Sequence, residues 1–337
     1  MRTPLFLLIW LLVSAAVFAG SIALGNDYIF FAGYVVLQYV VLGTAWNILG
    51  GYCGYVNFGS AAFFALGAYS TVAIYRLITD NEFYALPIPI LMLIGGIVSG
   101  VVGFGMGYLT LRLRGAFFAI ATLALAVVLQ TLVVNWDFVG GSRGAYIIRP
   151  EQIEPIGNYI RYLFLLMLLL AVAAITIARL VEHSRLGYGF ASIRDDELAA
   201  EASGVPTLRL KLIATTLSGA LMGMAGAPFP YYIGYLQPSS TFGLDYAVNS
   251  IAMPLIGGTT NWVGPLIGAL LLGSLQQIAT VTISSAVNLL IVGFLLVIFV
   301  IIAPNGIVGL IHTYIQRKPE DFVGRRRIEA EMPGRVP

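Results

Sequence analysis

Long apolar runs separated by short polar stretches make up most of the chain. Helices are expected near residues 5–24, 28–49, 57–78, 86–109, 115–135, 160–180, 212–235, 244–258, 264–282 and 286–304. The runs are continuously apolar, whereas the strands of a membrane barrel alternate over about 10 residues. A hydrocarbon core about 30 Å thick needs roughly 20 apolar helical residues, so we predict an all-α, polytopic transmembrane bundle of about nine or ten membrane-spanning or re-entrant helices.

The run at 244–258 is the least regular of these segments. It contains Pro254 and ends in Gly257-Gly258. Proline removes a backbone hydrogen bond inside a helix, and glycine loosens it. We therefore interpret this segment as a broken or re-entrant helix rather than a complete span.

Composition agrees with a membrane protein. Hydrophobic residues are 59% of the chain and charged residues 10%, whereas soluble domains carry about 25% charged residues. The single cysteine, Cys53, excludes an intrachain disulfide, and His183 and His312 lie too far apart to indicate a metal site.

The basic residues indicate an orientation. If the N-terminus is cytoplasmic and the spans alternate, the outside receives only four of the 18 Lys and Arg residues, namely Arg76, Arg143, Arg149 and Arg161. Cytoplasmic loops of membrane proteins are enriched in Lys and Arg. We expect both termini in the cytoplasm of a bacterial inner (plasma) membrane protein. The segment 1–311 forms one transmembrane domain with a cytoplasmic loop at about 181–211, and 312–337 forms a charged cytoplasmic tail.

The N-terminal run raises the question of a cleaved signal peptide. Val17-Phe18-Ala19 fits a cleavage site, but the apolar run continues to Leu24. We therefore favour a retained first helix.

The sequence contains no recognisable motif for catalysis or for binding a nucleotide phosphate. No phosphate-binding loop of the form Gly-x-x-x-x-Gly-Lys-Ser/Thr occurs, and no catalytic triad or His-Glu-x-x-His motif is present. We expect no catalytic residue, metal, cofactor or nucleic-acid partner. We also expect no buried charge in the spans, which argues against proton coupling, whereas sodium coupling through backbone carbonyls stays open.

A polar island interrupts the apolar pattern midway, at residues 192–204. Ser192 or Asp195 can cap a helix whose first turn is acidic, and Gly204 and Pro206 can end it. A helix of about three turns with a small-residue face at Ala199, Ala200 and Ser203 suits docking on another protein, although an ordinary interfacial helix fits equally well. The candidate coupling residues are Arg194, Asp195, Asp196, Glu197, Ala199, Ala200 and Gly204.

Polar side chains within the spans are candidates for a cargo path. Those we select are Asn47, Asn57, Ser60, Gln130 and Asn249. Hydrogen bonds between helices are the more common role of such residues in a membrane.

Several motifs, in order, resemble one transporter family. Ala199-Ala200-x-x-x-Gly204 is similar to the loop by which ABC importer permeases dock on their ATPases, and Leu198, in place of the general Glu, is usual in the branched-chain amino acid subgroup. Further matches are Gly51-Tyr-x-Gly54-x-x-Asn57-x-Gly59, Leu113-Arg114-Gly115-x-Phe117-Phe118, Gly140-Gly141-x-x-Gly144, Ile256-Gly257-Gly258, Gly264-Pro265-x-x-Gly268-Ala269 and Pro304-x-Gly306-x-x-Gly309. The resemblance covers about residues 30–310 and points to the LivM type.

The resemblance implies a function and partners. It implies a permease subunit of an ATP-driven (ABC) importer for a small amino acid, with a second related permease, two ABC ATPases, a periplasmic binding protein and membrane lipid around it. Urea, short amides and aromatic acids are alternative cargoes in the wider family. From the residues alone, an ATP-independent secondary transporter or channel and a non-transport scaffold stay open.

Overall fold

The fold is almost entirely helical. The computed structural model describes residues 3–80, 86–110, 112–148, 152–153, 157–282, 285–302 and 306–310. The long helices are α1 (Thr3–Ala23), α2 (Asp27–Gly50), α3 (Ser60–Asp80), α4 (Ile88–Thr110), α5 (Ala116–Val134), α6 (Tyr159–Glu182), α9 (Thr207–Gly226), α12 (Leu244–Gly257), α13 (Val263–Thr282) and α14 (Ser285–Ile302). Shorter helices are α7 (Arg185–Asp195), α8 (Glu197–Ala202), α10 (Phe229–Ile233), α11 (Pro238–Thr241), η1 (Asp137–Val139) and η2 (Gly141–Arg143).

The length of the helices confirms the predicted class. Within the described ranges, eight segments are long and apolar enough to cross a membrane: α1 to α6, the stretch from α9 through α10, and α13. The 18-residue α14 is also strongly apolar. The protein is therefore a multi-pass membrane protein built as a helical bundle.

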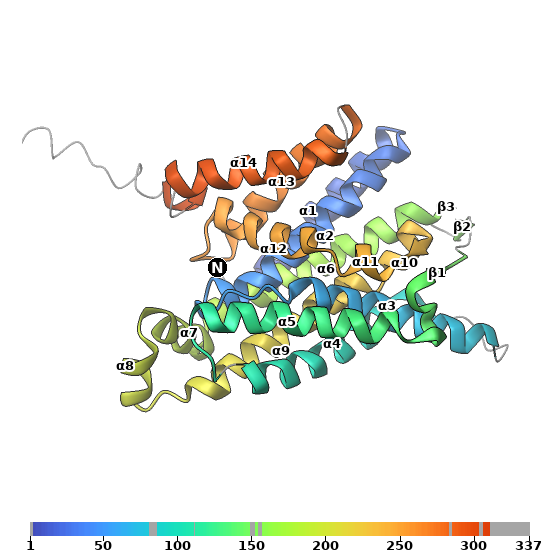
Figure 1. Ribbon diagram of the computed structural model, residues 1–337. Helices are drawn as coiled ribbons and strands as arrows, with labels where there is room; N and C mark the ends of the chain where they lie inside the picture. The colour runs from blue at the N-terminus through green and yellow to red at the C-terminus, as the bar shows by residue number, and fades with distance from the viewer. Residues whose placement is uncertain are drawn as a thin grey trace, which may run out of the picture.

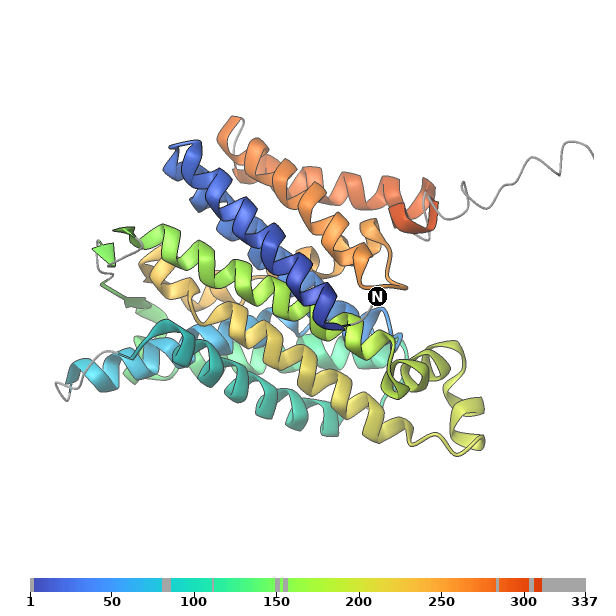
Figure 2. The ribbon, with the colours of Figure 1, turned by 180° about the vertical axis from the view of Figure 1, so that it is seen from behind.

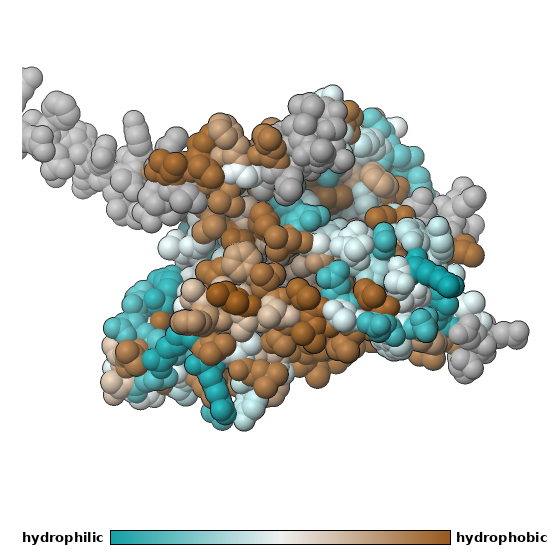
Figure 3. All heavy atoms as spheres, in the orientation of Figure 1, coloured by the Kyte–Doolittle hydropathy of each residue, from teal (hydrophilic) through white to brown (hydrophobic). Residues whose placement is uncertain are grey.

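The two ends of the bundle differ (Figure 1). One end carries α7, α8, the start of α1 and the last turn of α14, and we name it the α7/α8 end. The opposite end carries two small antiparallel pairs, β1 (Ala145–Tyr146) with β4 (Tyr235–Leu236), and β2 (Gln152–Ile153) with β3 (Gly157–Asn158). Figure 3 shows brown, hydrophobic side chains across the middle and teal, hydrophilic ones towards both ends, as expected for a protein that crosses a bilayer.

One predicted span needs correction. The helix expected at 212–235 begins earlier, at Thr207, and is interrupted after Gly226 before α10 begins. The stretch after α10 turns back, since β4 pairs with β1 and α11 follows directly. Pro228 is the N-cap of α10 and Pro230 is its second residue. At both places a helix makes no use of the backbone N–H that proline lacks.

α12 is the segment that the sequence marked as irregular. Its 14 residues extend about 21 Å, which is less than the hydrocarbon thickness. It ends where the N–H of Gly258 donates to the carbonyl of Pro254 at 2.7 Å. Gly258 has a φ of +122°, which L side chains rarely adopt. The helix is therefore a partial span, as the proline and the glycine pair indicated.

Glycines allow α3, α4 and α9 to approach closely. A Cβ added at Gly67 of α3 would lie 2.0 Å from the carbonyl oxygen of Gly223 in α9, and one added at Gly223 would lie 2.4 Å from the carbonyl oxygen of Gly95 in α4. Small residues permit this contact between helices in a membrane. The three helices α3, α4 and α9 are therefore tightly packed at this contact.

We predict that Gly67→Ala destabilises the bundle. The added methyl group meets backbone atoms of α9, which cannot move away as a flexible side chain would. Overpacking of this kind costs about 1 to 3 kcal/mol. The apparent melting temperature of the purified protein in detergent measures it. Gly105→Ala is the matched control, because nothing lies within 4 Å of a Cβ there. Equal melting temperatures for the two variants would contradict the packing argument.

Candidate functional site

The polar island folds as two short helices joined at one residue. Asp196 has an extended conformation, with φ −159° and ψ 108°, and so separates α7 from α8. Its Oδ1 accepts hydrogen bonds from the N–H groups of Leu198 at 2.9 Å and Ala199 at 3.0 Å. The prediction of one three-turn helix capped by Ser192 or Asp195 is wrong, because Asp196 is the residue that caps the second helix.

The end of α8 follows the sequence pattern. Gly204 has a φ of +83°, and the N–H of Val205 donates to the carbonyl of Ala200 at 3.0 Å. The small-residue face, however, is divided. Ala200 is buried against its own chain, whereas Ala199 and Ser203, one turn apart, are exposed. Leu198 is also exposed, at 63%, as are Glu201 and Ala202. The free surface of α8 therefore includes Leu198, Ala199 and Ser203.

Glu197, the first residue of α8, joins three other parts of the bundle. Its Oε1 lies 2.7 Å from Nζ of Lys211 in α9 and 3.6 Å from Nε of Arg114, just before α5. Its Oε2 accepts a hydrogen bond from the hydroxyl of Tyr55, in the loop between α2 and α3. The side chains of Glu197 and Lys211 are only 12% and 3% exposed. We call Glu197, Lys211, Tyr55 and Arg114 the Glu197 cluster.

The charge state of Glu197 follows from these contacts. Burial alone would raise the pKa of this carboxyl, but the hydrogen bonds from Lys211 and Tyr55 and the positive charges of Lys211 and Arg114 outweigh burial and lower the pKa below its ordinary value. Glu197 is therefore ionised at neutral pH. For Tyr55, burial and the contact with Glu197 raise the pKa, so its hydroxyl keeps the proton that it donates.

A second set of contacts holds the same loop from the α6 side. Oε2 of Glu182, the last residue of α6, accepts hydrogen bonds from the hydroxyl of Tyr52 at 3.2 Å and from the N–H of Trp262 at 2.8 Å. Arg194 in α7 reaches the loop as well, since its Nη1 lies 3.5 Å from the carbonyl of Gly51. The Gly51-Tyr-x-Gly54 motif therefore lies where α6, α7 and α8 meet.

The close approach explains one glycine of that motif. Gly54 has a φ of +79°, and a Cβ there would lie 3.0 Å from Cγ of Arg194. Asp195, by contrast, is 73% exposed and lies 3.4 Å from Arg194. Among the candidate coupling residues, Glu197 and Arg194 make the contacts that connect this region with the bundle.

Sequence reasoning missed the residues that bind Glu197. It placed Lys211 in a loop and expected no buried charge in the spans, which is wrong, since Lys211 is in α9 and is 2% exposed. The available signal was a lone lysine between Leu210 and Leu212 at the start of an apolar run. Tyr55 carried no such signal, because its partner lies 142 residues away.

The candidate path residues do not form one site. Three of them, Asn47, Asn57 and Ser60, are near the α7/α8 end. Oδ1 of Asn57 accepts a hydrogen bond from the N–H of Gly59 at 2.7 Å. Trp46, beside Asn47 in α2, donates to the carbonyl of Asn57 at 2.9 Å. Nδ2 of Asn47 lies 3.5 Å from the carbonyl of Asn261. Ser60 begins α3 and is buried. These residues join the ends of α2 and α3 to the turn after α12.

The other two candidates lie elsewhere. Asn249 in α12 donates to the hydroxyl of Tyr39 at 3.3 Å and accepts from Nε2 of Gln276 at 2.8 Å, and so links α12 with α2 and α13. Gln130 is partly exposed on α5, near its end at the β1/β4 side. The side chain of Asn57 makes a local hydrogen bond within the loop before α3, whereas the hydrogen bonds of Asn249 join helices, as membrane bundles commonly show.

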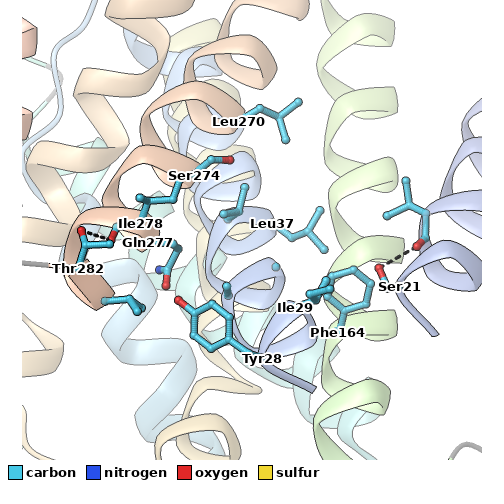
Figure 4. A pocket seen from close by; sticks show the side chains of 15 residues that line it. Ser21, Tyr28, Ile29, Leu37, Phe164, Leu270, Ser274, Gln277, Ile278 and Thr282 are labelled. Carbon is cyan, nitrogen blue, oxygen red and sulfur yellow. Dashed lines mark hydrogen bonds between the residues drawn. The ribbon is translucent and has the colours of Figure 1, made fainter. Parts of the chain in front are cut away.

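A cleft of about 540 Å³ lies between α1, α2, α6 and α13 (Figure 4). Its walls are mostly aliphatic and aromatic, and its polar groups are neutral, among them Tyr28, Ser274 and Gln277. Among the described residues, no charged side chain lines it. The described lining therefore offers no charged group that would pair with the ammonium or carboxylate of an amino acid. In the described part of the chain, no group of three or more His, Cys, Asp and Glu residues could hold a metal ion.

Comparison with known proteins identifies the family of this chain. The family described as the permease component of branched-chain amino acid transport systems matches residues 28–300. The chain belongs to this family. That range contains the Glu197 cluster and all the helices from α2 to α13, so the family covers both the bundle and the polar island. No solved structure matches the chain.

Three relatives are named as branched-chain amino acid permeases. The high-affinity branched-chain amino acid transport system permease protein LivM of Salmonella typhimurium is 26% identical over 87% of this chain and 72% of that protein. LivM of Escherichia coli is 26% identical over 84% of this chain and 71% of that protein. A probable branched-chain amino acid transport permease, LivH of Methanocaldococcus jannaschii, is 24% identical over 73% of this chain and 82% of that protein.

We predict that Glu197→Gln strongly destabilises this permease. The change leaves the ammonium of Lys211 buried without its counter-charge, and breaking a buried pair in this way costs about 3 to 5 kcal/mol. Chemical denaturation of the purified protein measures the change. Asp27→Asn is the control, because its pair with Arg161 is solvent-exposed and is worth less than about 1 kcal/mol. Similar losses for both variants would contradict the assigned role of the Glu197 cluster.

The stability difference between wild type and Glu197→Gln should depend on pH. Because folding lowers the pKa of Glu197, its ionised form stabilises the fold above the carboxyl's unfolded pKa, and this contribution is lost as pH falls through the lower, folded value. The difference should be constant near neutral pH and shrink in acid. Melting temperatures of both proteins across acidic and neutral pH test this. A difference that grows on acidification would contradict it.

Proposed function

We propose that this chain is a permease subunit of an ATP-driven importer that moves a small, branched-chain amino acid across the bacterial inner membrane. Membership of the permease family and the names of the LivM relatives support the cargo class. The chain itself contributes no enzymatic step. Its proposed partners are a second related permease, two ABC ATPases and a periplasmic binding protein.

The distribution of basic residues supports an orientation with the α7/α8 end in the cytoplasm. Arg112, Arg114, Arg185, Arg194 and Arg209 lie at or near that end. At the opposite end, Arg143 lies in η2 and Arg161 in the first turn of α6. Cytoplasmic excess of basic residues is the general rule for membrane proteins. The tail 312–337, proposed to be cytoplasmic and separate from the transmembrane domain, lies outside the described residues.

The observation that carries the proposal is the construction of α8. Its outer surface is free, and its inner surface is held by a nearly buried ion pair. An ATPase that pushes on Leu198 and Ala199 would move Glu197, and with it Lys211 at the start of α9. Because α9 packs along α3 and α4 through glycine contacts, displacement of α9 would shift the three helices together.

The contacts of Arg114 and Tyr55 extend this transmission. Arg114 binds Glu197 and Glu201 and directly precedes α5, so α5 would follow α8. Tyr55 connects α8 to the loop between α2 and α3, which contains Asn57 and is flanked by Asn47 in α2 and Ser60 in α3. In this proposal, closure of the ATPases changes the positions of these three residues, which border the cytoplasmic part of a path between the two permeases. Gln130 and Asn249 stay candidates for that path nearer the outside.

We predict that Asp196→Ala uncouples ATP hydrolysis from transport. Loss of the Asp196 cap weakens α8 by about 1 kcal/mol, so force on it is transmitted less completely. In vesicles reconstituted with all subunits, leucine uptake per ATP hydrolysed should fall several-fold. Asn26→Ala removes an equivalent cap from α2, far from α8, and should leave the ratio unchanged.

Three outcomes would overturn parts of the proposal. An unchanged ratio for Asp196→Ala would remove α8 from the mechanism. Uptake by this chain alone in vesicles without ATP would identify a secondary transporter or channel. ATP-dependent uptake of urea, short amides or aromatic acids, with none of leucine, isoleucine or valine, would reassign the cargo.

A further inference from the structure

A second groove lies on the outer surface of α9, next to α4. It has a volume of about 700 Å³ and is lined by Phe104, Leu208, Arg209, Leu212, Ile213, Thr216, Leu217 and Ala220. The residues from α9 form two parallel rows with a spacing of four, which is the spacing of one helix face. Apart from Arg209 and Thr216, every lining side chain is apolar. The groove is separate from the Glu197 cluster and from the cleft in Figure 4.

The length of this groove fits one leaflet of a bilayer. From Leu208 to Ala220 the helix rises about 18 Å, whereas half of a typical hydrocarbon core is about 15 Å. Arg209 stands at the α7/α8 end of the groove, in the first turn of α9. An extended acyl chain lying along α9 would therefore place its head group at Arg209.

A second arginine, Arg112, follows the end of α4 at a similar level. α4 and α9 run antiparallel and side by side (Figures 1 and 2), and a Cβ at Gly103 would lie 3.2 Å from the carbonyl of Thr215. This register, continued for two turns, brings the end of α4 at Thr110 beside Arg209. Arg112 follows two residues later, exposed, with its guanidinium 5.8 Å from the ring of Tyr108.

These two arginines are not neutralised by acidic side chains. Among the described residues, no ion pair involves Arg112 or Arg209, whereas neighbouring Arg114 binds Glu197 and Glu201. Paired cationic charges at the rim of an apolar groove at the membrane surface complement a lipid phosphate, and basic pockets between helices bind anionic lipid head groups. Guanidinium groups suit phosphate oxygens particularly well, since they offer paired donors.

We propose that this groove binds an anionic phospholipid, with the phosphate at Arg209 and Arg112 and one acyl chain along α9. The site does not depend on the proposed cargo or on the ATPases. It adjoins the Glu197 cluster, because Lys211 follows Arg209 by two residues on the same turn of α9. A bound lipid would thus contact the start of the helix that carries the buried lysine.

Native mass spectrometry of the full transporter complex tests the site. The complex is loaded with phosphatidylglycerol or with phosphatidylcholine of the same acyl chains. We expect wild type to retain phosphatidylglycerol preferentially. Each basic residue near a membrane surface contributes about fivefold in affinity for an anionic lipid. The double variant Arg112→Gln/Arg209→Gln should therefore bind phosphatidylglycerol more than tenfold more weakly than wild type. Arg185→Gln is the control, since Arg185 is exposed at the same end of the bundle but outside the groove.

A second measurement keeps the test independent of variant folding. A photoreactive acyl chain on phosphatidylglycerol should label the peptide 208–220 of the wild-type chain, and Ile213→Trp, which fills the groove, should abolish the label. Equal retention of both lipids by wild type, or an unchanged preference in the double arginine variant, would overturn the proposal. Displacement of the lipid by inorganic phosphate alone would show a simple anion site instead. Cross-linking of Ile213→Cys to the second permease would show that a protein covers the groove.

Discussion

The buried ion pair between Glu197 and Lys211 is the interaction on which the α7/α8 end of this permease depends. An ionised carboxylate and an ammonium are removed from water together, at a cost that their mutual attraction and the hydroxyl of Tyr55 must offset. Withdrawing either charge removes the closest counter-charge of the other, and Glu197 then keeps only the more distant Arg114 at 3.6 Å among its described cations. The pair therefore fixes α8 to α9 far more firmly than the six residues of α8 could manage by themselves.

The placement of this pair connects three observations that are separate in the sequence. Asp196 starts α8, the glycine-containing loop at residues 51–59 supplies Tyr55, and the Leu113-Arg114-Gly115 motif supplies a second cation. Each of these motifs belongs to a different part of the chain, yet all meet at Glu197. A rigid junction of this kind suits the proposed coupling to a separate ATPase subunit. A short helix can transmit displacement to the bundle only if its inner side stays fixed to the neighbouring helices.

Much of the fold could be predicted from the sequence because the bilayer imposes a simple rule. Apolar runs of sufficient length must become helices whose backbone groups are satisfied internally, and the boundaries of α2, α4, α6 and α13 agree with prediction within a few residues. The polar island was located for the same reason. The division into α7 and α8, the early start of α9 and the β1–β4 pair were not foreseen, since they depend on contacts between residues distant in the chain.

The candidate site was predictable in position but not in mechanism. Sequence alone selected Glu197 and Arg194, yet it gave Ala200 the same status, although this residue is buried in its own chain. The burial of Lys211 was not predicted, because a basic residue beside a loop is normally solvated. Only the residues that the fold brings next to Lys211 show that its side chain is buried. For the polar residues of the spans, sequence alone does not decide between contacts within the protein and a cargo path, because the answer depends on geometry. Asn57 and Asn249 make hydrogen bonds within the bundle. Asn47 and Ser60 lie beside the loop that contains Tyr55.

The central claim is that an ATPase acts on the free surface of α8, and site-directed cross-linking examines it most directly. Leu198→Cys places a thiol on that surface, and the native Cys53 is buried. In inner-membrane vesicles containing the whole transporter, an oxidant or short bifunctional reagent should join Leu198→Cys to the ATPase subunit, while Tyr146→Cys, exposed at the opposite end, should not react with it. An adduct between Leu198→Cys and the periplasmic binding protein, with ATPase adducts formed from Tyr146→Cys, would contradict the account.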